Sequence, residues 1–106
     1  MHIDKKKFRR ILDFLKLNGL KIDDTFTPKP IGIGQSNPTF LIQDNDLNLK
    51  VLRMQPSGAL VRGAHRVDRE FLVLNALKEK NFIIPKPIIH CDDASVIEQQ
   101  FYVMNF

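Results

Sequence analysis

Two groups of residues in the sequence have the types and the spacing of a phosphate-handling site. The first is the segment Gly32-Ile33-Gly34-Gln35-Ser36-Asn37, which stands between two predicted strands. Glycines at such a place let backbone N–H groups approach a phosphate closely. The same residues also suit an ordinary tight turn of a hairpin, because Asn37 stands where a third glycine would be expected. No helix is predicted directly after the glycines, which argues against a dinucleotide site of the Rossmann type.

The second group is Arg53 and Glu70. Side chains of a strand alternate between its two faces, so Val51 and Arg53 point the same way. Transfer of a phosphoryl group from a nucleotide needs a cation on the phosphates and a carboxylate that holds the cation. Arg53 suits the first role, Glu70 on the following helix suits the second, and an adenine ring would rest on Val51. Taken separately, Arg53 and Glu70 also suit a solvated surface; the order of loop, cation strand and carboxylate helix favours the nucleotide site.

These residues need elements that position them, and the chain is predicted to begin with an amphipathic helix. Four apolar residues have the i, i+3, i+4, i+7 spacing of one helical stripe: Phe8, Ile11, Leu12 and Leu15. Asp4 is a suitable N-cap and Gly19 a suitable end. We expect an N-terminal amphipathic helix within residues 1–22 and a nucleotide-binding lobe over residues 23–106.

The rest of the chain is predicted to be a sheet with one helix inserted. The predicted strands are Ile31–Gly34, Thr39–Gln43, Asn48–Met54, Ile88–Cys91 and Phe101–Asn105. The predicted helix, Ala64–Lys80, has Val67, Phe71, Leu74 and either Leu77 or Lys78 on its inner stripe. Gln55–Gly63 is expected to be a loop, and Pro85 and Pro87 an extended connector. The predicted fold is α+β, an antiparallel sheet of about five strands with one packed helix and an extra N-terminal helix. This is the plan of the protein-kinase-like N-lobe.

Four segments together resemble the start of aminoglycoside-phosphotransferase-like domains. They are Gly34-Gln35-Ser36-Asn37-Pro38-Thr39-Phe40, Val51-Leu52-Arg53, Val67-Asp68-Arg69-Glu70-Phe71 and Phe101-Tyr102-Val103-Met104. The branch they resemble most is the one fused to acyl-CoA dehydrogenases in animals and present as separate phosphotransferases in bacteria. The resemblance runs from about Pro30 to Phe106. One departure from the family pattern is Glu98-Gln99-Gln100, where a more compact turn is expected before the last strand.

The resemblance implies a role for each matching residue. Gly34, Gln35, Ser36 and Asn37 would cover the phosphates of ATP. Arg53 would stand in place of the usual strand lysine, where its planar fork engages two oxygens, and Glu70 would hold it. Val103, Met104 and Asn105 would form a hinge whose backbone groups meet the adenine edge.

We assign no catalytic and no metal-binding residue to this chain. In the family, the catalytic base and the ligands of Mg²⁺ belong to a second lobe, beyond the position of Phe106. His90-Cys91-Asp92 has the His-x-Asp spacing that opens a kinase catalytic loop. We reject it, because Ile97 rather than Asn lies five residues after Asp92, and because the segment precedes the hinge.

The positive charge of the chain is concentrated in the first helix. The net charge is +4, and residues 1–21 hold seven basic side chains against two acidic ones. Such a helix could contact nucleic acid or an anionic membrane, but a solvated polar face explains it more simply, so we expect neither partner. The single cysteine, Cys91, excludes an internal disulfide and fits a cytoplasmic protein.

Two functional classes stay open at this stage. The first is the ATP-binding part of a phosphotransferase that transfers the γ-phosphate of ATP to a small-molecule hydroxyl, with Mg²⁺ as cofactor and no activity for this chain alone. The second is a non-catalytic binding or assembly module that keeps the same fold. In either class the face that a second lobe would meet, with Val51, Val103, Met104 and Phe106 partly uncovered, should either drive self-association or leave the chain only marginally stable.

Overall fold

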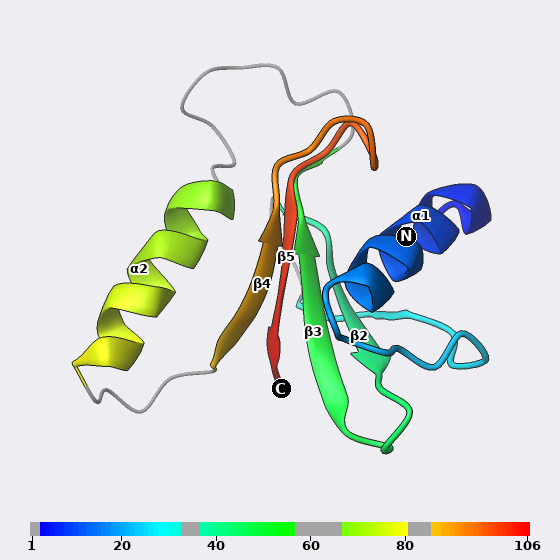
Figure 1. The fold of residues 1–106 in the computed structure, drawn as a ribbon, viewed down its shortest axis with the longest axis horizontal. Helices are drawn as coiled ribbons and strands as arrows, with labels where there is room; N and C mark the ends of the chain where they lie inside the picture. The colour runs from blue at the N-terminus through cyan, green and yellow to red at the C-terminus, as the bar shows by residue number, and fades with distance from the viewer. Residues whose placement is uncertain (1–2, 33–36, 57–66, 81–85) are drawn as a thin grey trace.

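The structure is a computed structural model that describes residues 3–32, 37–56, 67–80 and 86–106. Its elements are α1 (Lys5–Leu17), β1 (Lys29–Pro30), β2 (Thr39–Gln43), β3 (Leu49–Met54), α2 (Val67–Glu79), β4 (Pro87–Cys91) and β5 (Phe101–Asn105). The strands form one antiparallel sheet in the order β1-β2-β3-β5-β4. Figure 1 shows α1 and α2 on opposite sides of this sheet. The predicted fold class, that of a kinase-like N-lobe, is confirmed.

Helix α1 begins and ends where its capping residues predict. The Asp4 carboxylate accepts a hydrogen bond from the backbone N–H of Lys7 at 3.0 Å, which satisfies one of the unpaired donors of the first turn. After the helix, Gly19 has a φ of 87°, a left-handed conformation that glycine adopts without steric cost.

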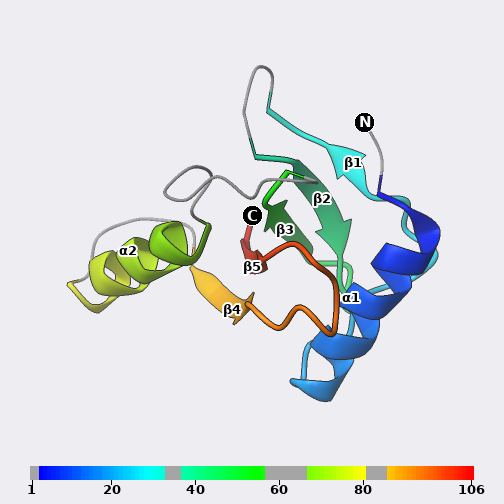
Figure 2. The same cartoon turned by 90° about the horizontal axis from the view of Figure 1, so that it is seen from above.

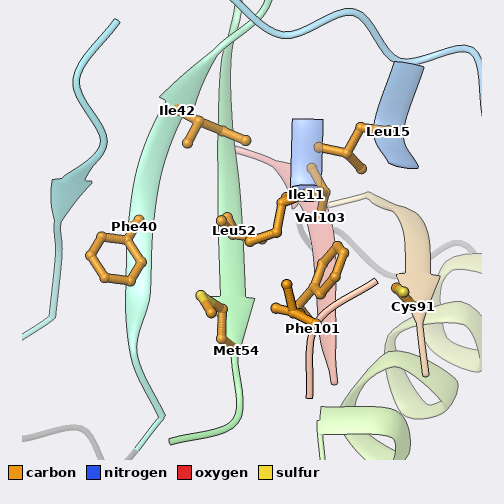
Figure 3. Packing of buried hydrophobic residues seen from close by; sticks show 10 residues of the cluster. Ile11, Leu15, Phe40, Ile42, Leu52, Met54, Cys91, Phe101 and Val103 are labelled. Carbon is orange, nitrogen blue, oxygen red and sulfur yellow. The ribbon is translucent and has the colours of Figure 1, made fainter. Parts of the chain in front are cut away.

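The hydrophobic core lies between α1 and one face of the sheet. Figure 3 shows Ile11 and Leu15 of α1 facing side chains of the strands. The cluster consists of Ile11, Leu15, Phe40, Ile42, Leu52, Met54, Cys91, Ile97, Phe101 and Val103. Helix α1 therefore shares one core with the sheet of the lobe.

The segment Glu98-Gln99-Gln100 joins α1 to the end of the sheet. The Gln99 side chain is buried; it accepts a hydrogen bond from the Lys7 ammonium and donates one to the Gln55 backbone carbonyl at 2.7 Å. The departure from the family pattern thus provides a polar link between α1 and the residues that follow β3.

The first strand differs from the prediction over Ile31–Gly34. The structure places β1 at Lys29–Pro30, so the strand begins before the predicted start at Ile31. Pairing continues to Ile31, whose N–H donates to the Thr39 carbonyl at 2.9 Å. Gly32 has a φ of 83°, which turns the chain out of the extended conformation and ends the strand. Ile33 and Gly34 lie outside the described residues.

Helix α2 packs on the opposite face of the sheet over β4 and β5 (Figure 2). Val67 is fully buried, and the Phe71 ring stacks on His90 with ring centroids 5.4 Å apart. Leu77, and not Lys78, completes the inner stripe, since Leu77 is half-buried and Lys78 is exposed. Two apolar residues of α2 are largely exposed: Leu72 is 67% exposed and Val73 is 52% exposed.

Several predicted boundaries fall outside the part of the chain that the structure describes. These are residues 57–63 of the Gln55–Gly63 loop, residues 64–66 of the predicted helix, and Pro85. His90 and Cys91 lie in β4, so the rejected His-x-Asp triplet begins in a strand. No helix within the four described ranges has the length and apolar composition needed to cross a bilayer.

Candidate nucleotide site

The strand register brings Thr39, Arg53 and Tyr102 into one row across the sheet. Arg53 on β3 pairs with Thr39 on β2 and with Tyr102 on β5. Residues directly opposite each other in antiparallel strands point to the same face. The side chains of this row therefore lie on the α2 side of the sheet, away from the core that α1 covers.

Arg53 and Glu70 form a two-pronged ion pair on this face. The Nε of Arg53 donates to Oε1 of Glu70 at 2.6 Å, and a terminal guanidinium nitrogen donates to Oε2 at 3.3 Å. The side chains are 20% and 34% exposed, respectively. The predicted pairing of the strand cation with the helix carboxylate is confirmed. A lysine at position 53 could not reproduce this geometry, because its compact ammonium lacks the planar pair of nitrogens that meets both carboxylate oxygens side-on.

Three further side chains complete the cluster around this ion pair. Thr39 Oγ1 accepts a hydrogen bond from Arg53 at 2.9 Å. The Tyr102 hydroxyl donates to Glu70 Oε1 at 3.0 Å, and the Asn37 side-chain amide donates to Glu70 Oε2 at 3.1 Å. Sequence reasoning did not assign Thr39 or Tyr102 to the site. Alternation along β2 and β5 puts each of them on one of two faces, but which face is shared with Arg53 is known only from the pairing with β3.

The environment of Tyr102 keeps its hydroxyl protonated. Burial, followed by the charge of Glu70 and the hydrogen bond to it, raises the pKa of Tyr102 well above its usual range. Because an ionised carboxylate only accepts hydrogen bonds, the tyrosine O–H must be the donor to Glu70.

Two adjoining cavities lie beside the ion pair. One, of about 340 Å³, is lined by Ile31, Gly32, Thr39, Val51, Arg53, Met104, Asn105 and Phe106. The other, of about 460 Å³, is lined by Arg53, Arg69, Glu70, Val73, Leu74, Tyr102 and Met104. Arg53 and Met104 line both cavities. A cation at the edge of an apolar hollow suits a ligand that has a flat apolar part and an anionic part.

The predicted site residues fall into three groups in the structure. Gly34, Gln35 and Ser36 lie outside the described residues. Asn37 lies at the ion pair, where it contacts the carboxylate of Glu70. Val51 and Met104 are cross-strand partners that line the smaller cavity.

The structure places the predicted hinge residues Val103–Asn105 in the last strand, and Met104 and Asn105 line the smaller cavity. All three residues lie within β5, which pairs with β3 on one side and with β4 on the other. Val103 and Met104 therefore lie between two paired strands, and their backbone groups are not on an open edge of the sheet. The Asn105 N–H donates to the Lys86 carbonyl at 2.8 Å, and its side chain accepts from the Lys50 ammonium at 2.9 Å.

The expectation that Val51 and Val103 would be partly uncovered is wrong. Val51 is 4% exposed, because it lies on the central strand β3 between its cross-strand partners Leu41 and Met104. Val103 is fully buried, because it pairs with Leu52 and so faces the core under α1.

Comparison with known proteins gives one family. The profile of the phosphotransferase enzyme family matches residues 27–106. No solved structure gives a significant match to the chain.

Three curated relatives illustrate the similarity. Human acyl-CoA dehydrogenase family member 11 is 45% identical over 87 residues, which cover 82% of this chain and 11% of the relative. A probable acyl-CoA dehydrogenase of Arabidopsis thaliana is 47% identical over 85 residues, covering 76% of this chain and 10% of the relative. Mouse acyl-CoA dehydrogenase family member 10 is 42% identical over 73 residues, covering 69% and 7%.

The chain thus spans about a tenth of the length of the curated relatives it matches. These relatives are acyl-CoA dehydrogenases by name, in agreement with the branch that the sequence resembles. Because the family profile covers the sheet, α2 and the Arg53–Glu70 pair, the chain belongs to the phosphotransferase enzyme family.

Proposed function

We propose that this chain is the ATP-binding part of a phosphotransferase that transfers the γ-phosphate of ATP to the hydroxyl of a small molecule. The observation that carries the proposal is the ion pair between Arg53 and Glu70, 2.6 Å apart, at the edge of an apolar cavity lined by Val51 and Met104. Membership of the phosphotransferase enzyme family supports it.

The described residues would make two kinds of contact with ATP. The side chains of Val51 and Met104 would contact the adenine ring in the smaller cavity, which Asn105 of the predicted hinge also lines. The guanidinium of Arg53 provides positive charge for the phosphates, and Glu70 holds it in one orientation. Gly34, Gln35, Ser36 and Asn37 would cover the phosphates with backbone N–H groups.

Mg²⁺ would neutralise charge on the phosphates during transfer. We assign its ligands and the catalytic base to a second lobe of a longer protein, in keeping with the small share of each relative that this chain spans. We therefore expect the chain alone to bind ATP weakly and to transfer no phosphate, because positioning the reactants supplies most of the catalysis.

The acceptor class is suggested by the relatives. They are named as acyl-CoA dehydrogenases, enzymes whose substrates are acyl-CoA thioesters. We propose a hydroxylated acyl-CoA as the first acceptor to test in a longer protein that contains this chain.

Binding of ATP to the chain itself is the direct test. An NMR titration of labelled chain with ATP should give saturable shifts in β3, β5 and α2. Arg53→Met should weaken ATP binding at least about tenfold, the effect of losing one charge-assisted hydrogen bond. Arg10→Met, on the exposed side of α1, is the matched control and should leave binding unchanged. Equal ATP affinity in all three proteins would refute the proposal.

One observation favours the alternative of a binding or assembly module. Leu72, Val73 and Phe106 are more than half exposed, and exposed apolar side chains that form one patch mark an interaction surface. A chain that associates with itself or another protein through these residues, and gives no saturable ATP shifts, would support this alternative.

A further inference from the structure

Within the described residues, the Glu70 carboxylate receives four hydrogen bonds from three separate segments. Oε1 accepts from Arg53 Nε at 2.6 Å and from the Tyr102 hydroxyl at 3.0 Å. Oε2 accepts from an Arg53 terminal nitrogen at 3.3 Å and from the Asn37 amide at 3.1 Å. Two carboxylate oxygens offer about four acceptor positions, so donors from β3, β5 and the segment before β2 fill the group.

Tyr102 is the rigid member of this set. It is 3% exposed, lies directly across from Arg53 on the neighbouring strand, and packs its ring edge-on to Phe71 at 5.8 Å. Other side chains of α2 are exposed to solvent, among them Leu72 and Val73. The hydroxyl of Tyr102 therefore ties a carboxylate on a partly exposed helix to a strand in the middle of the sheet.

Asn37 makes the equivalent contact from the end of the glycine-containing segment. It is 4% exposed, and its amide orientation is fixed, because only the NH₂ group can donate to a carboxylate. Its Oδ1 atom is buried and has no hydrogen-bond partner in the structure described here. Burial of an amide oxygen without a hydrogen bond costs free energy, so the contact between Asn37 and Glu70 is kept in spite of that cost.

We propose that Tyr102 is a positioning residue of the phosphate site, whose hydroxyl fixes Glu70 and thereby holds Arg53 in the orientation that phosphate binding requires, with Asn37 acting on the same carboxylate. The inference rests on the proposed function. It adds to the Arg–Glu pair a residue whose hydroxyl acts on Arg53 through the shared carboxylate of Glu70.

A positioning role and a purely structural role of Tyr102 predict different effects of its substitution on nucleotide binding. Tyr102→Phe retains the ring, and with it the packing on Phe71, and removes only the oxygen. Glu70 then loses one of its four donors and gains freedom to move. The consequence should fall on the phosphate-dependent part of nucleotide binding, since the apolar cavity beside Val51 and Met104 is unchanged.

The experiment compares ATP with adenosine as ligands of the wild-type chain and of Tyr102→Phe. We expect ATP affinity to fall about three- to tenfold, within the range for net loss of one intramolecular hydrogen bond, and adenosine affinity to stay within about twofold. Leu72→Ala, an exposed change on the same helix, is the control and should leave both affinities unchanged. An equal fall for ATP and adenosine in Tyr102→Phe, or no fall for either, would overturn the inference.

A double-mutant cycle tests whether Tyr102 acts through Glu70. Adding Tyr102→Phe to Glu70→Ala should cost no further ATP affinity if the hydroxyl has no other role. Additive losses in the cycle would contradict the inference.

A measurement without nucleotide separates this inference from the proposed function. The Arg53 Nε–H proton should exchange with solvent faster in Tyr102→Phe than in the wild-type chain, because its acceptor is less firmly held. Failure of the wild-type chain to bind ATP would count against the nucleotide site, whereas an unchanged exchange rate would count against the positioning role of Tyr102.

Discussion

Arg53 and Tyr102 lie directly opposite each other on β3 and β5, and both donate hydrogen bonds to the same atom, Oε1 of Glu70. The two donors come from neighbouring strands, while the acceptor comes from a helix, 17 residues after Arg53 and 32 residues before Tyr102 in the sequence. A cation held in this way has its orientation set by the sheet as well as by the helix. Phosphate binding at Arg53 is therefore expected to depend on how α2 docks on the sheet.

Replacing Arg53 by lysine should weaken the site although it keeps the charge. The lysine ammonium cannot reproduce both contacts to Glu70 and the contact to Thr39 Oγ1. We expect the free energy of unfolding to fall by about 1–2 kcal/mol and ATP affinity to fall severalfold. Urea denaturation and an ATP titration measure the two effects. The matched control is Arg10→Lys on the exposed side of α1; a similar loss in that variant would show that the effect is not specific to the ion pair.

Strand positions and the central ion pair could be predicted from the sequence because both depend on local order. Thr39–Gln43 and Phe101–Asn105 are the strands that the structure contains. Alternation along β3 placed Val51 and Arg53 on one face, and the order of loop, strand and helix placed Glu70 near Arg53. None of these inferences required knowledge of which strands are neighbours.

The contributions of Tyr102 and Val103 could not be predicted in the same way. Strand β5 pairs with β3 although about fifty residues of sequence separate Arg53 from Tyr102, and this register decides which side chains face the core. It places Val103 against Leu52 under α1 and Tyr102 against Glu70. Without the register, the last strand resembles a hinge that ends in an exposed apolar surface.

Core packing under α1 should dominate the stability of the chain. Leu52 is fully buried in the cluster between α1 and the sheet. Leu52→Ala should lower the free energy of unfolding by about 2–5 kcal/mol, through lost burial and the cavity left behind. Leu17→Ala is the control, because Leu17 is 87% exposed and should change stability by less than about 0.5 kcal/mol. A small effect at Leu52 would mean that α1 does not pack on the sheet as described.

The N-cap of α1 should contribute a smaller, separable amount. Asp4→Ala removes the acceptor for the Lys7 N–H and should lower the free energy of unfolding by about 1 kcal/mol. Asp13→Ala, an exposed aspartate within the same helix, serves as the comparison and is expected to have no such cost. Chemical denaturation of the two variants side by side distinguishes a capping effect from a general effect of charge.

Cys91 should make the stability of the chain decrease with pH in the alkaline range. Burial raises the pKa of the Cys91 thiol, with the charges of Asp93 and Asp92 adding to the effect and a backbone hydrogen bond opposing it. Below the unfolded pKa of about 8.5 the thiol is protonated in both states, so its contribution to stability is fully present. Above that pH the unfolded chain loses the proton and the folded chain keeps it, which favours unfolding by up to about 1.4 kcal/mol per pH unit.

The measurement is urea denaturation between about pH 8.5 and 9.5, below the range in which tyrosine titrates. Cys91→Ala should be less stable overall but should show a flatter dependence on pH than the wild-type chain. Parallel slopes in the two proteins would contradict the assignment to Cys91.

Self-association should proceed through apolar side chains on the α2 side of the sheet. The surface consists of Leu72, Val73, Met104 and Phe106, and replaces the set expected from the sequence, in which Val51 and Val103 are in fact buried. Leu72, Val73 and Phe106 are 67%, 52% and 73% exposed. Burial of each side chain would contribute about 1.5–3 kcal/mol, so that a few together suffice to drive association.

Light scattering over a concentration series should therefore show growth in mass for the wild-type chain. The double variant Leu72→Glu, Val73→Glu should remain monomeric, because charged side chains on this surface oppose its burial. Leu47→Glu is the matched control: Leu47 is 73% exposed but lies in the turn between β2 and β3, so its substitution should leave association intact. A wild-type chain that stays monomeric, with a melting temperature independent of concentration, would show that this surface does not drive association.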